Sequence, residues 1–379
     1  MKADLENIID QNRVWYCLDC GKCGAVCPIT HWEKSSFSSP RLLIEKAING
    51  HTEDLFNDPL FWSCLICKRC TELCPSDVHF TEFLRDARQV AHNRGRSGEC
   101  THGEIIQTWA RMMTDPDLHQ NRTGWLSDDL HVSEDSDTIL FIGCLPYYDS
   151  IFKRIDFEGL EIARAAVKLL NGCGIEPIIL EEERCCGRDQ LWEGDVDTFQ
   201  RLAKLNLEMF KQTGAKRIVS TCPECVRTLK IDYPDLVGPH GMEVFHISEI
   251  LMDQNFSPGK TLQGSVSYHD PCNLGRHLGV YEPPRQAILD LGLELIEMGR
   301  SKETSLCCGT GCWRSCGQVS KNIQVERLSE AKSTGAERLV TTCIKCQIHF
   351  KCAQDDPYLK DKIDIPIQDL TTLLAESLG

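Results

Sequence analysis

Cysteine is the residue that most constrains this chain. The sequence contains 23 cysteines among 379 residues, and most of them fall into short motifs instead of being spread evenly. The N-terminus, which begins Met1-Lys2-Ala3-Asp4, is polar and unlike a secretory signal peptide. In a chain without an export signal, clustered cysteines indicate metal ligation or redox chemistry before they indicate disulfide bonds. We therefore expect a cytoplasmic protein with cysteine-bound metal.

Two runs of four cysteines near the N-terminus share the spacing C-x2-C-x2-C-x3-C, and a proline follows each run. The runs are Cys17, Cys20, Cys23 and Cys27, and Cys64, Cys67, Cys70 and Cys74. In two-cluster ferredoxins with this spacing, three cysteines hold one 4Fe-4S cluster and the fourth ligates the other cluster. The pattern thus predicts one cluster on Cys17, Cys20, Cys23 and Cys74, and another on Cys64, Cys67, Cys70 and Cys27. Tetrahedral zinc is the alternative, because C-x2-C pairs also suit zinc.

Ten further cysteines form two sets of five in the same order. Each set has a single cysteine, then a Cys-Cys-Gly triplet, then a C-x2-C pair. The sets are Cys144, Cys185, Cys186, Cys222 and Cys225, and Cys272, Cys307, Cys308, Cys343 and Cys346. The residues before the last pair also match, with TGAKRIVSTC ending at Cys222 and TGAERLVTTC ending at Cys343. The C-terminal part is therefore a duplication of a whole domain, larger than a solenoid repeat.

The periodicity of apolar residues predicts an α/β fold with an all-helical N-terminal domain. We expect helices at 39–50, with Ser39 as the N-cap and Gly50 after its end, at 80–93, and around 105–113. In the duplicated part, strands and helices alternate, which predicts βαβ units and a parallel, Rossmann-like sheet in each copy. The expected strands are 138–143, 175–180 and 217–221, then 264–269, 293–298 and 338–342. The expected helices are 155–171, 196–213, 284–291 and 318–334, with one more after Cys222 and after Cys343.

This pattern predicts four segments. They are a helical ferredoxin domain at 1–95, a linker at 96–137, a first copy at 138–255 and a second copy at 256–379. The cysteine motifs follow the expected strands, and open α/β sheets bind ligands beyond the carboxyl ends of their strands. Helix N-termini after Cys222 and Cys343 would also stabilise thiolates.

Composition excludes two classes of partner. Hydrophobic residues make up 41% and charged residues 26%, which is typical of a globular chain. The net charge of −15 disfavours nucleic acid, whose binding depends on basic contacts to phosphates. No stretch approaches the roughly 20 apolar residues that span a bilayer, so we expect no direct membrane span.

The motifs resemble those of heterodisulfide reductase. Residues 15–78 are similar to its small iron-sulfur subunit, and residues 138–353 are similar to its CCG-domain catalytic subunit. Their fusion in this order resembles the D subunit of the membrane-linked enzyme. The resemblance implies two cubane 4Fe-4S clusters in the N-terminal domain and one noncubane 4Fe-4S cluster on each five-cysteine set. It also implies cleavage of the disulfide between coenzyme M and coenzyme B, a small thiol/disulfide substrate.

The resemblance leaves a second function open. Related CCG proteins relay electrons toward quinone in the oxidation of glycolate, lactate or glycerol-3-phosphate. Many of those carry incomplete cysteine sets, whereas both sets here are complete, which favours the reductase-like activity. In either case the electrons would come from a partner flavoprotein, haem subunit or iron-sulfur protein, and contact with the membrane would depend on a partner subunit. A zinc-bound scaffold is the third alternative.

Five cysteines lie outside these sets. Cys100, Cys173 and Cys352 each stand alone, and an isolated cytoplasmic cysteine is usually a small buried hydrophobe. Cys312 and Cys316 follow Cys308 in one loop, and their redox or ligand role stays open. The family usually has glycines after the triplet, so Cys312 and Trp313 are a departure at the second set.

Several polar residues near the second set have two interpretations. His269, Asp270 and His277 flank Cys272, where they could tune a cluster or protonate a product thiolate, or form an ordinary strand end and turn. Glu181, Glu182 and Glu183 precede Cys185, either as a source of negative charge or as a solvated loop. Four more basic residues could meet an anionic substrate or be ordinary surface charges, namely Arg276, Arg285, Lys345 and His349.

Overall fold

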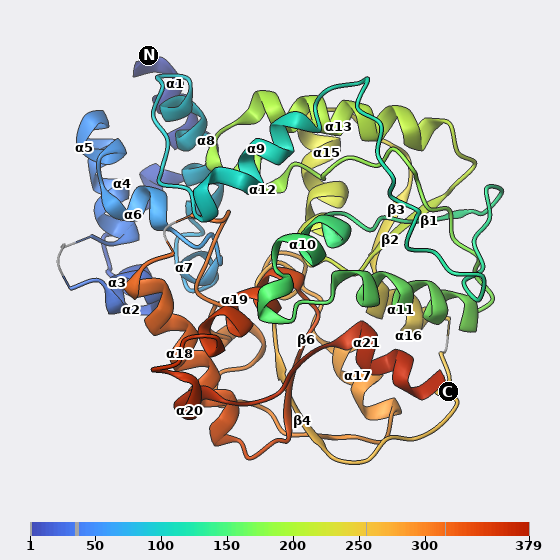
Figure 1. Cartoon of the computed structure of the whole chain (residues 1–379). Coiled ribbons are helices and arrows are strands. Elements are labelled where there is room, and N and C mark those ends of the chain that lie inside the picture. Colours follow the sequence, from blue (N-terminus) through green and yellow to red (C-terminus); the bar gives the residue numbers. More distant parts are fainter. Residues whose placement is uncertain (1, 35–37, 255, 315, 379) are drawn as a thin grey trace. The chain divides into compact units, whose positions relative to one another are not determined.

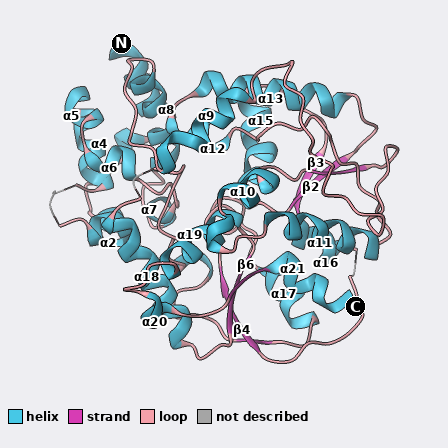
Figure 2. Ribbon diagram, viewed as in Figure 1, coloured by secondary structure: helices cyan, strands magenta, loops and turns pink. Residues whose placement is uncertain are grey.

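The computed structural model describes residues 2–34, 38–254, 256–314 and 316–378. Its helices and strands are shown in Figures 1 and 2. The chain forms two compact units. The helical unit comprises Met1–Arg111, Gly187–Phe199 and Leu306–Gln324, and the sheet unit comprises Met112–Cys186, Gln200–Ser305 and Val325–Gly379. The helical unit thus includes two segments from the duplicated part of the sequence, each next to a Cys-Cys-Gly triplet. The domain boundaries expected from the sequence stay predictions.

The N-terminal part is helical, as predicted. Helix α4 begins at Pro40 because the hydroxyl of Ser39 accepts a hydrogen bond from the backbone N–H of Leu42 at 3.3 Å, and Gly50 follows its end with φ +72°. The helices are α1 (Lys2–Gln11), η1 (Val14–Tyr16), α2 (Lys22–Val26), α3 (Pro28–Trp32), α4 (Pro40–Ile48), α5 (Thr52–Phe56), α6 (Pro59–Ser63), α7 (Arg69–Glu72), α8 (Phe80–His92), η2 (His102–Glu104) and α9 (Ile105–Met112). The predicted helices at 39–50, 80–93 and 105–113 are therefore confirmed as α4, α8 and α9.

Two parallel sheets lie in the sheet unit, one for each copy of the duplicated sequence. The first has the order β1-β2-β3 and the second β5-β4-β6-β7. The strands are β1 (Thr138–Leu140), β2 (Arg217–Ser220), β3 (Glu243–His246), β4 (Ser265–His269), β5 (Glu294–Leu295), β6 (Arg338–Thr341) and β7 (Ile367–Asp369). Their apolar residues are buried, as expected where helices cover a parallel sheet. The predicted α/β class with two duplicated parallel sheets is confirmed.

Two details of the predicted sheets are wrong. Residues 175–180 form only a single bridge, between Ile139 and Ile178, and the equivalent segment of the second copy is the two-residue strand β5. The last strand of each sheet, β3 and β7, was not expected. Each has only three or four residues, and half or more of them are polar, so the alternation is too short to be recognised.

The remaining helices belong to the duplicated part of the sequence, and some of them join the two copies. Helix α11 packs against α21, and α16 packs against α17, so each pair joins one helix from each copy. These elements are α10 (Leu145–Ile151), η3 (Lys153–Ile155), α11 (Gly159–Gly172), α12 (Arg188–Glu193), α13 (Val196–Lys211), α14 (Pro223–Arg227), η4 (Thr228–Asp232), α15 (Tyr233–Leu236), α16 (Ile247–Asp253), α17 (Glu282–Asp290), η5 (Lys302–Thr304), α18 (Gln318–Ser333), α19 (Ile344–Gln354), α20 (Lys360–Ile363), α21 (Leu370–Ala375) and η6 (Glu376–Leu378). Among the described residues, no helix combines the length and apolar character needed to cross a membrane.

The segment expected to be a linker, 96–137, contains packed residues. Ile106 and Ala110 of α9 are buried, and so are Arg122 and Trp125 further along the segment. The acidic stretch at 127–137 is mostly exposed, although Leu130 is buried. The middle of this segment therefore belongs to the folded structure.

Candidate metal centres

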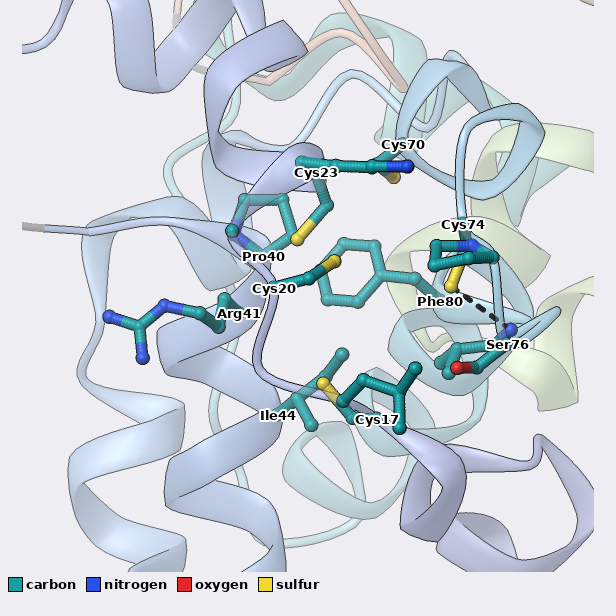
Figure 3. Close-up of a pocket in the computed structure, with 15 residues that line it drawn as sticks. Cys17, Cys20, Cys23, Pro40, Arg41, Ile44, Cys70, Cys74, Ser76 and Phe80 are labelled. Carbon is teal, nitrogen blue, oxygen red and sulfur yellow. Dashed lines mark hydrogen bonds between the residues drawn. The ribbon is translucent and has the colours of Figure 1, made fainter.

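The eight N-terminal cysteines line two pockets of the helical unit. The first pocket is lined by Cys17, Cys20, Cys23 and Cys74, and its wall also includes Cys70, Pro40 and Phe80 (Figure 3). The second is lined by Cys27, Cys64, Cys67 and Cys70, with Pro40 and Phe80 again in the wall. Each pocket thus combines three cysteines of one run with the fourth cysteine of the other run. This is the same division as that of the predicted ligand sets.

The backbone of the two runs curls in the same way. In the first run Asp19 and Gly21 have φ values of +53° and +76°, and in the second run the equivalent residues Ile66 and Lys68 have +54° and +62°. A positive φ in a β-branched residue such as Ile66 is strained, at a cost of about 1–3 kcal/mol. These left-handed conformations turn the chain between successive cysteines, so that both runs surround a pocket. Such strain is typical of ligand-binding loops.

The thiols of these pockets fit a cationic group. Burial raises the pKa of Cys64 to about 12 and the pKa of Cys23 to about 11. Burial also raises the pKa of Cys70 well above its usual range, and the neighbouring thiols Cys64 and Cys67 add to this effect. Bound iron would instead lower the pKa values of these thiols, because a metal cation favours the thiolate.

The first five-cysteine set gathers in the sheet unit. Cys144 follows β1 and forms the N-cap of α10, and Cys222 follows β2 and forms the N-cap of α14. The Sγ atoms of Cys144 and Cys185 are 3.7 Å apart, and those of Cys186 and Cys225 are 3.5 Å apart. All five are buried. The pKa of Cys225 is raised well above its usual range by hydrogen bonds with Cys186 and Cys222 and by burial.

A buried ion pair holds the loop before Cys144. Glu183 accepts hydrogen bonds from the backbone N–H groups of Gly143 at 2.7 Å and Ile142 at 3.2 Å. Its carboxylate lies 2.9 Å from the guanidinium of Arg122, which also donates to the carbonyl oxygen of Gly143. Burial raises the pKa of Glu183 to about 7, against the opposing charge of Arg122. For Glu183, the interpretation as a solvated loop is therefore wrong, because its side chain is inaccessible to solvent.

The second set is divided between the two units. Cys272, Cys343 and Cys346 lie in the sheet unit, where Cys343 is the N-cap of α19, whereas Cys307 and Cys308 lie in the helical unit. All of these are buried except Cys272, which is half-buried. Cys272 follows β4 by a short turn, but Cys307 lies twelve residues after β5, and Cys185 follows the single bridge at Ile178 instead of a strand. For both Cys-Cys-Gly motifs, the expected position directly after a strand is therefore wrong.

Equivalent residues of the two copies meet inside the sheet unit. Glu224, between Cys222 and Cys225, pairs at 2.5 Å with Lys345, which has the same place between Cys343 and Cys346. The side-chain amide of Asn273 donates to Glu224 at 3.3 Å and lies 3.7 Å from the Sγ of Cys272. The ion pair therefore joins the two C-x2-C loops and reaches the first cysteine of the second set.

His246 makes a second connection between the copies. Its Nε2 lies 3.2 Å from the carbonyl oxygen of Thr221 and 2.9 Å from the hydroxyl of Thr342, and these two threonines precede Cys222 and Cys343. Its Nδ1 accepts a hydrogen bond from the backbone N–H of Ser248, so His246 also caps α16. Burial lowers the pKa of His246 to about 4. Neither His246 nor Arg122 was singled out from the sequence, because neither belongs to a motif.

The other polar candidates hold the second copy together. Arg285 pairs with Asp270 at 2.7 Å and with Glu297 at 2.5 Å. Arg276 donates to the backbone carbonyl oxygens of Glu303 and Ser305. The ring of His269 accepts from Arg327 at 3.1 Å. The remaining candidates, His277, Lys345 and His349, are also buried, so the interpretation of the basic residues as surface charges is wrong.

The loop after Cys308 is anchored in the helical unit. Cys312 and Trp313 are buried and have φ values of +51° and +55°, and the carbonyl oxygen of Trp313 accepts from the backbone N–H of Thr101 at 2.9 Å. Cys316 is exposed and lines a groove of about 1000 Å³ together with Cys100. The isolated cysteines Cys100, Cys173 and Cys352 are half-buried, which differs from their expected burial. Among the described residues, no group of three His, Cys, Asp or Glu side chains is arranged to hold a single metal ion.

Known families match most of the cysteine motifs. A 4Fe-4S dicluster domain matches residues 13–78, and a cysteine-rich domain named CCG matches residues 139–230 and 266–351. The D subunit of the dihydromethanophenazine:CoB–CoM heterodisulfide reductase of Methanosarcina acetivorans is 34% identical over an alignment of 272 positions, which covers 69% of this chain and 63% of that protein. The chain is a homologue of this heterodisulfide reductase component. It covers less than two thirds of the length of that relative.

Other homologues carry different names. An EtfAB:quinone oxidoreductase of Syntrophomonas wolfei is 34% identical over an alignment of 249 positions, which covers 59% of this chain and 34% of that protein. An uncharacterized iron-sulfur protein of Methanococcus maripaludis is 28% identical over an alignment 392 positions long, which covers 99% of this chain and 75% of that protein. In structure, a hypothetical protein from Helicobacter pylori matches the whole chain and 76% of its own length with a TM-score of 0.52 at 12% identity. That last likeness concerns the fold alone.

Proposed function

We propose that this chain is the iron-sulfur subunit of an oxidoreductase that reduces, or forms, a disulfide such as that between coenzyme M and coenzyme B. The observation that carries the proposal is the completeness of both five-cysteine sets, together with the close packing of the buried thiols of the first set. The similarity to the D subunit of heterodisulfide reductase supports the same activity.

The cysteines divide into four ligand sets under this proposal. Two cubane 4Fe-4S clusters would lie in the two N-terminal pockets, on Cys17, Cys20, Cys23 and Cys74, and on Cys64, Cys67, Cys70 and Cys27. Two noncubane 4Fe-4S clusters would lie on the five-cysteine sets. When bound, the clusters supply single electrons, and cleavage of one disulfide consumes two electrons and two protons and yields two thiols.

The chain's own residues would position the clusters. The positive ends of the helices that begin after Cys144, Cys222 and Cys343 favour thiolates over thiols. Glu183 and Arg122 fix the loop before Cys144, and the Glu224–Lys345 pair ties one C-x2-C loop to the other. These contacts keep the ligands that lie in the sheet unit in a fixed arrangement, which lowers the reorganisation that electron transfer requires.

The proposal includes a redox partner and a location. Electrons would enter from a flavoprotein, a haem subunit or another iron-sulfur protein and would pass through the N-terminal clusters to the five-cysteine sets. We place the chain in the cytoplasm because its thiols must stay reduced to bind iron. A partner subunit would provide any attachment to the membrane.

A second candidate function rests on the similarity to the EtfAB:quinone oxidoreductase. In that case the chain is an electron relay within a flavin- or quinone-linked complex and converts no substrate of its own. The same cysteines would serve, because a relay requires the clusters but no disulfide binding site.

One assay separates the two candidates. The chain is purified without oxygen, its iron and sulfide are measured, and reduced methyl viologen is supplied as the electron donor. On addition of the coenzyme M–coenzyme B disulfide, we expect oxidation of the dye and release of both thiols. The variant Cys186→Ser should abolish turnover, whereas Cys173→Ser, at a half-buried cysteine outside the sets, should not. No turnover in a preparation with iron and sulfide for four clusters would favour the relay.

A further inference from the structure

Exposed apolar side chains gather beside the first N-terminal pocket. Trp15, Tyr16, Leu18 and Leu73, which we call the apolar rim, are 50%, 63%, 71% and 48% exposed. Single exposed hydrophobic residues are common on protein surfaces, but a contiguous group usually marks an interaction site. The rim accounts for four of the eleven large hydrophobic residues that are exposed in the described part of the chain.

The rim is adjacent to the thiols of that pocket. Tyr16 and Leu18 flank Cys17, Leu18 itself lines the pocket, and Leu73 precedes Cys74. In Figure 3 the sulfur atoms of Cys17, Cys20, Cys23 and Cys74 surround one space. Cys20 is also exposed, unlike any cysteine of the second pocket. A redox centre held here would therefore lie close to the rim and to the surface.

The internal repeat of the two cysteine runs provides a matched comparison. Leu18 follows Cys17 as Leu65 follows Cys64, yet Leu18 is 71% exposed and Leu65 only 6%. Ile66, the next residue of the second run, is 2% exposed. The same motif therefore buries its leucine at one pocket and presents it to solvent at the other, so exposure is not a requirement of the motif.

Polar contacts hold the rim in place. The guanidinium of Arg13 lies 5.2 Å from the ring centroid of Tyr16 and 3.8 Å from Asp77. The backbone carbonyl of Asn12 accepts a hydrogen bond from the N–H of His79 at 3.1 Å. These contacts tie the segment that carries η1 and Leu18 to the loop that follows Leu73. The two parts of the rim are thus preformed, which lowers the entropic cost of binding.

The size of the rim indicates the kind of occupant. Given roughly 150–250 Å² for an aromatic side chain, these exposed fractions leave about 400 Å² of apolar surface. A stable protein interface buries about 800 Å² on each partner, whereas transient redox complexes fall below about 1200 Å² in total. The rim therefore supplies apolar surface on the scale of one side of a transient redox complex. It is smaller than the apolar part of an obligate dimer face, which is about 65% of roughly 1000 Å² or more.

The charges around the rim support the same occupant. Charged residues of both signs stand near the rim, among them Arg13, Asp19, Lys22, Arg41, Glu45 and Asp77. The whole chain has a net charge of −15. An apolar surface whose neighbouring charges are mixed in sign favours a partner that docks by an apolar face of its own, with little dependence on salt.

We propose that the apolar rim is the docking surface for the electron-carrying partner, a redox protein whose own one-electron centre lies beneath an apolar patch. This inference rests on the proposed function, because it takes the thiols of the first pocket as cluster ligands. In each encounter the reduced partner loses one electron and the centre beside the rim gains it. The complex then dissociates.

The test compares protein donors with a small donor. Fully loaded chain, with iron and sulfide measured, is mixed in a stopped-flow instrument with reduced flavodoxin, with a reduced two-cluster ferredoxin, or with reduced methyl viologen. We expect Trp15→Ser and Leu73→Ser each to lower the second-order rate from the protein donors at least tenfold, in low salt and in 0.5 M salt alike. The rate from viologen should not change. The control Leu289→Ser, a leucine on α17 that is 50% exposed, should change neither rate.

The outcomes distinguish this inference from the proposed function. If viologen reduces no cluster in the unchanged chain, the proposed function fails. If viologen reduces the clusters but neither protein donor does, or if the rim variants keep full rates from the protein donors, the rim is not the docking surface. An equal loss from viologen and from the proteins would mean that the substitutions damage the pocket, which also overturns the inference.

Discussion

The two kinds of cysteine site differ in how they are held. The N-terminal cysteines are exposed or half-buried and are shaped by backbone conformation, with left-handed residues such as Asp19 and Ile66 between them. The first five-cysteine set is buried and is held by polar contacts from distant segments, above all those of Glu183 and Arg122. The first arrangement suits exchange of electrons with a partner, and the second suits chemistry protected from water.

The difference implies that the two regions respond differently to substitution. A site shaped by its own backbone conformation is little affected by substitutions elsewhere in the chain. A buried ion pair, in contrast, is lost when either of its two residues is replaced. Substitutions in the polar contacts of the sheet unit should therefore cost the most stability. A substitution at Cys316, an exposed cysteine outside the proposed ligand sets, should cost the least.

The largest effect is expected at Glu183. Its replacement by leucine leaves the buried guanidinium of Arg122 without its counter-ion and the N–H of Gly143 without an acceptor. Removal of one member of a buried pair costs about 3–5 kcal/mol in the free energy of unfolding. Anaerobic urea titration followed by tryptophan fluorescence measures this loss. Glu182→Leu is the control, because its side chain is 38% exposed, and it should change the free energy by less than about 0.5 kcal/mol.

The double variant Glu183→Leu with Arg122→Leu sharpens this test. Because both charges are removed, it should recover part of the stability that Glu183→Leu loses. Equal losses in Glu183→Leu and Glu182→Leu would contradict the assignment of the ion pair as the contact that holds the loop.

A smaller, pH-dependent effect is expected at His246. Its pKa is lowered to about 4 by burial, whereas an unfolded histidine has a pKa of about 6.5. Between these values the unfolded chain binds one more proton than the folded chain, so stability falls as the pH decreases from about 6.5 to about 4. The total loss is about 3 kcal/mol. Protonation of Nδ1 also removes the acceptor for the N–H of Ser248.

The variant His246→Asn isolates this contribution. Asparagine is a good N-cap for α16 but does not titrate. Thermal unfolding of both proteins between pH 5 and pH 8 should show a steeper loss toward low pH in the unchanged chain. Both proteins carry the same acid-labile clusters, so subtracting one pH curve from the other cancels the loss of stability that the clusters cause. Parallel curves would contradict a buried neutral histidine at this position.

Local features of the fold could be predicted, but distant contacts could not. Ser39 and Gly50 bound α4 because capping depends on adjacent residues. The cysteine runs form pockets because two-residue gaps allow only a short, curled loop. The three consecutive glutamates 181–183 look alike in sequence, yet only Glu183 is fully buried, because Arg122 and the 142–143 backbone reach it from other parts of the chain. No local sequence pattern predicts the contact between Glu183 and these distant groups.

The glycines of the two Cys-Cys-Gly triplets should show an intermediate effect. Gly187 has φ +79°, and a Cβ there would lie 2.9 Å from the ring of Phe199. Gly309 has φ +95°, and a Cβ there would lie 2.8 Å from the carbonyl oxygen of Ser320. Alanine at either position should cost about 1–3 kcal/mol, because it combines backbone strain with a steric clash.

The control for these glycines is Gly335→Ala. Gly335 has φ +78° but open space around its Cα, so alanine there adds strain without a clash. Urea titration should therefore show a smaller loss for Gly335→Ala than for Gly187→Ala or Gly309→Ala. The same loss at all three positions would mean that backbone conformation alone, and not the close approach of α13 and α18, requires the glycines.

The smallest effect on stability is expected at Cys316, and chemical labelling separates cysteines that bind iron from cysteines that do not. Cys20 and Cys316 are both exposed, but only Cys20 belongs to a proposed ligand set. In the loaded protein, iodoacetamide should modify Cys316 and spare Cys20, and mass spectrometry of peptides identifies the labelled site. After removal of iron by a chelator, Cys20 should react as well. If Cys20 is labelled before iron is removed, it is not a ligand. If Cys316 is labelled only after iron is removed, Cys316 is a ligand. Cys316→Ser should change the free energy of unfolding by less than about 0.5 kcal/mol, because an exposed side chain makes few stabilising contacts.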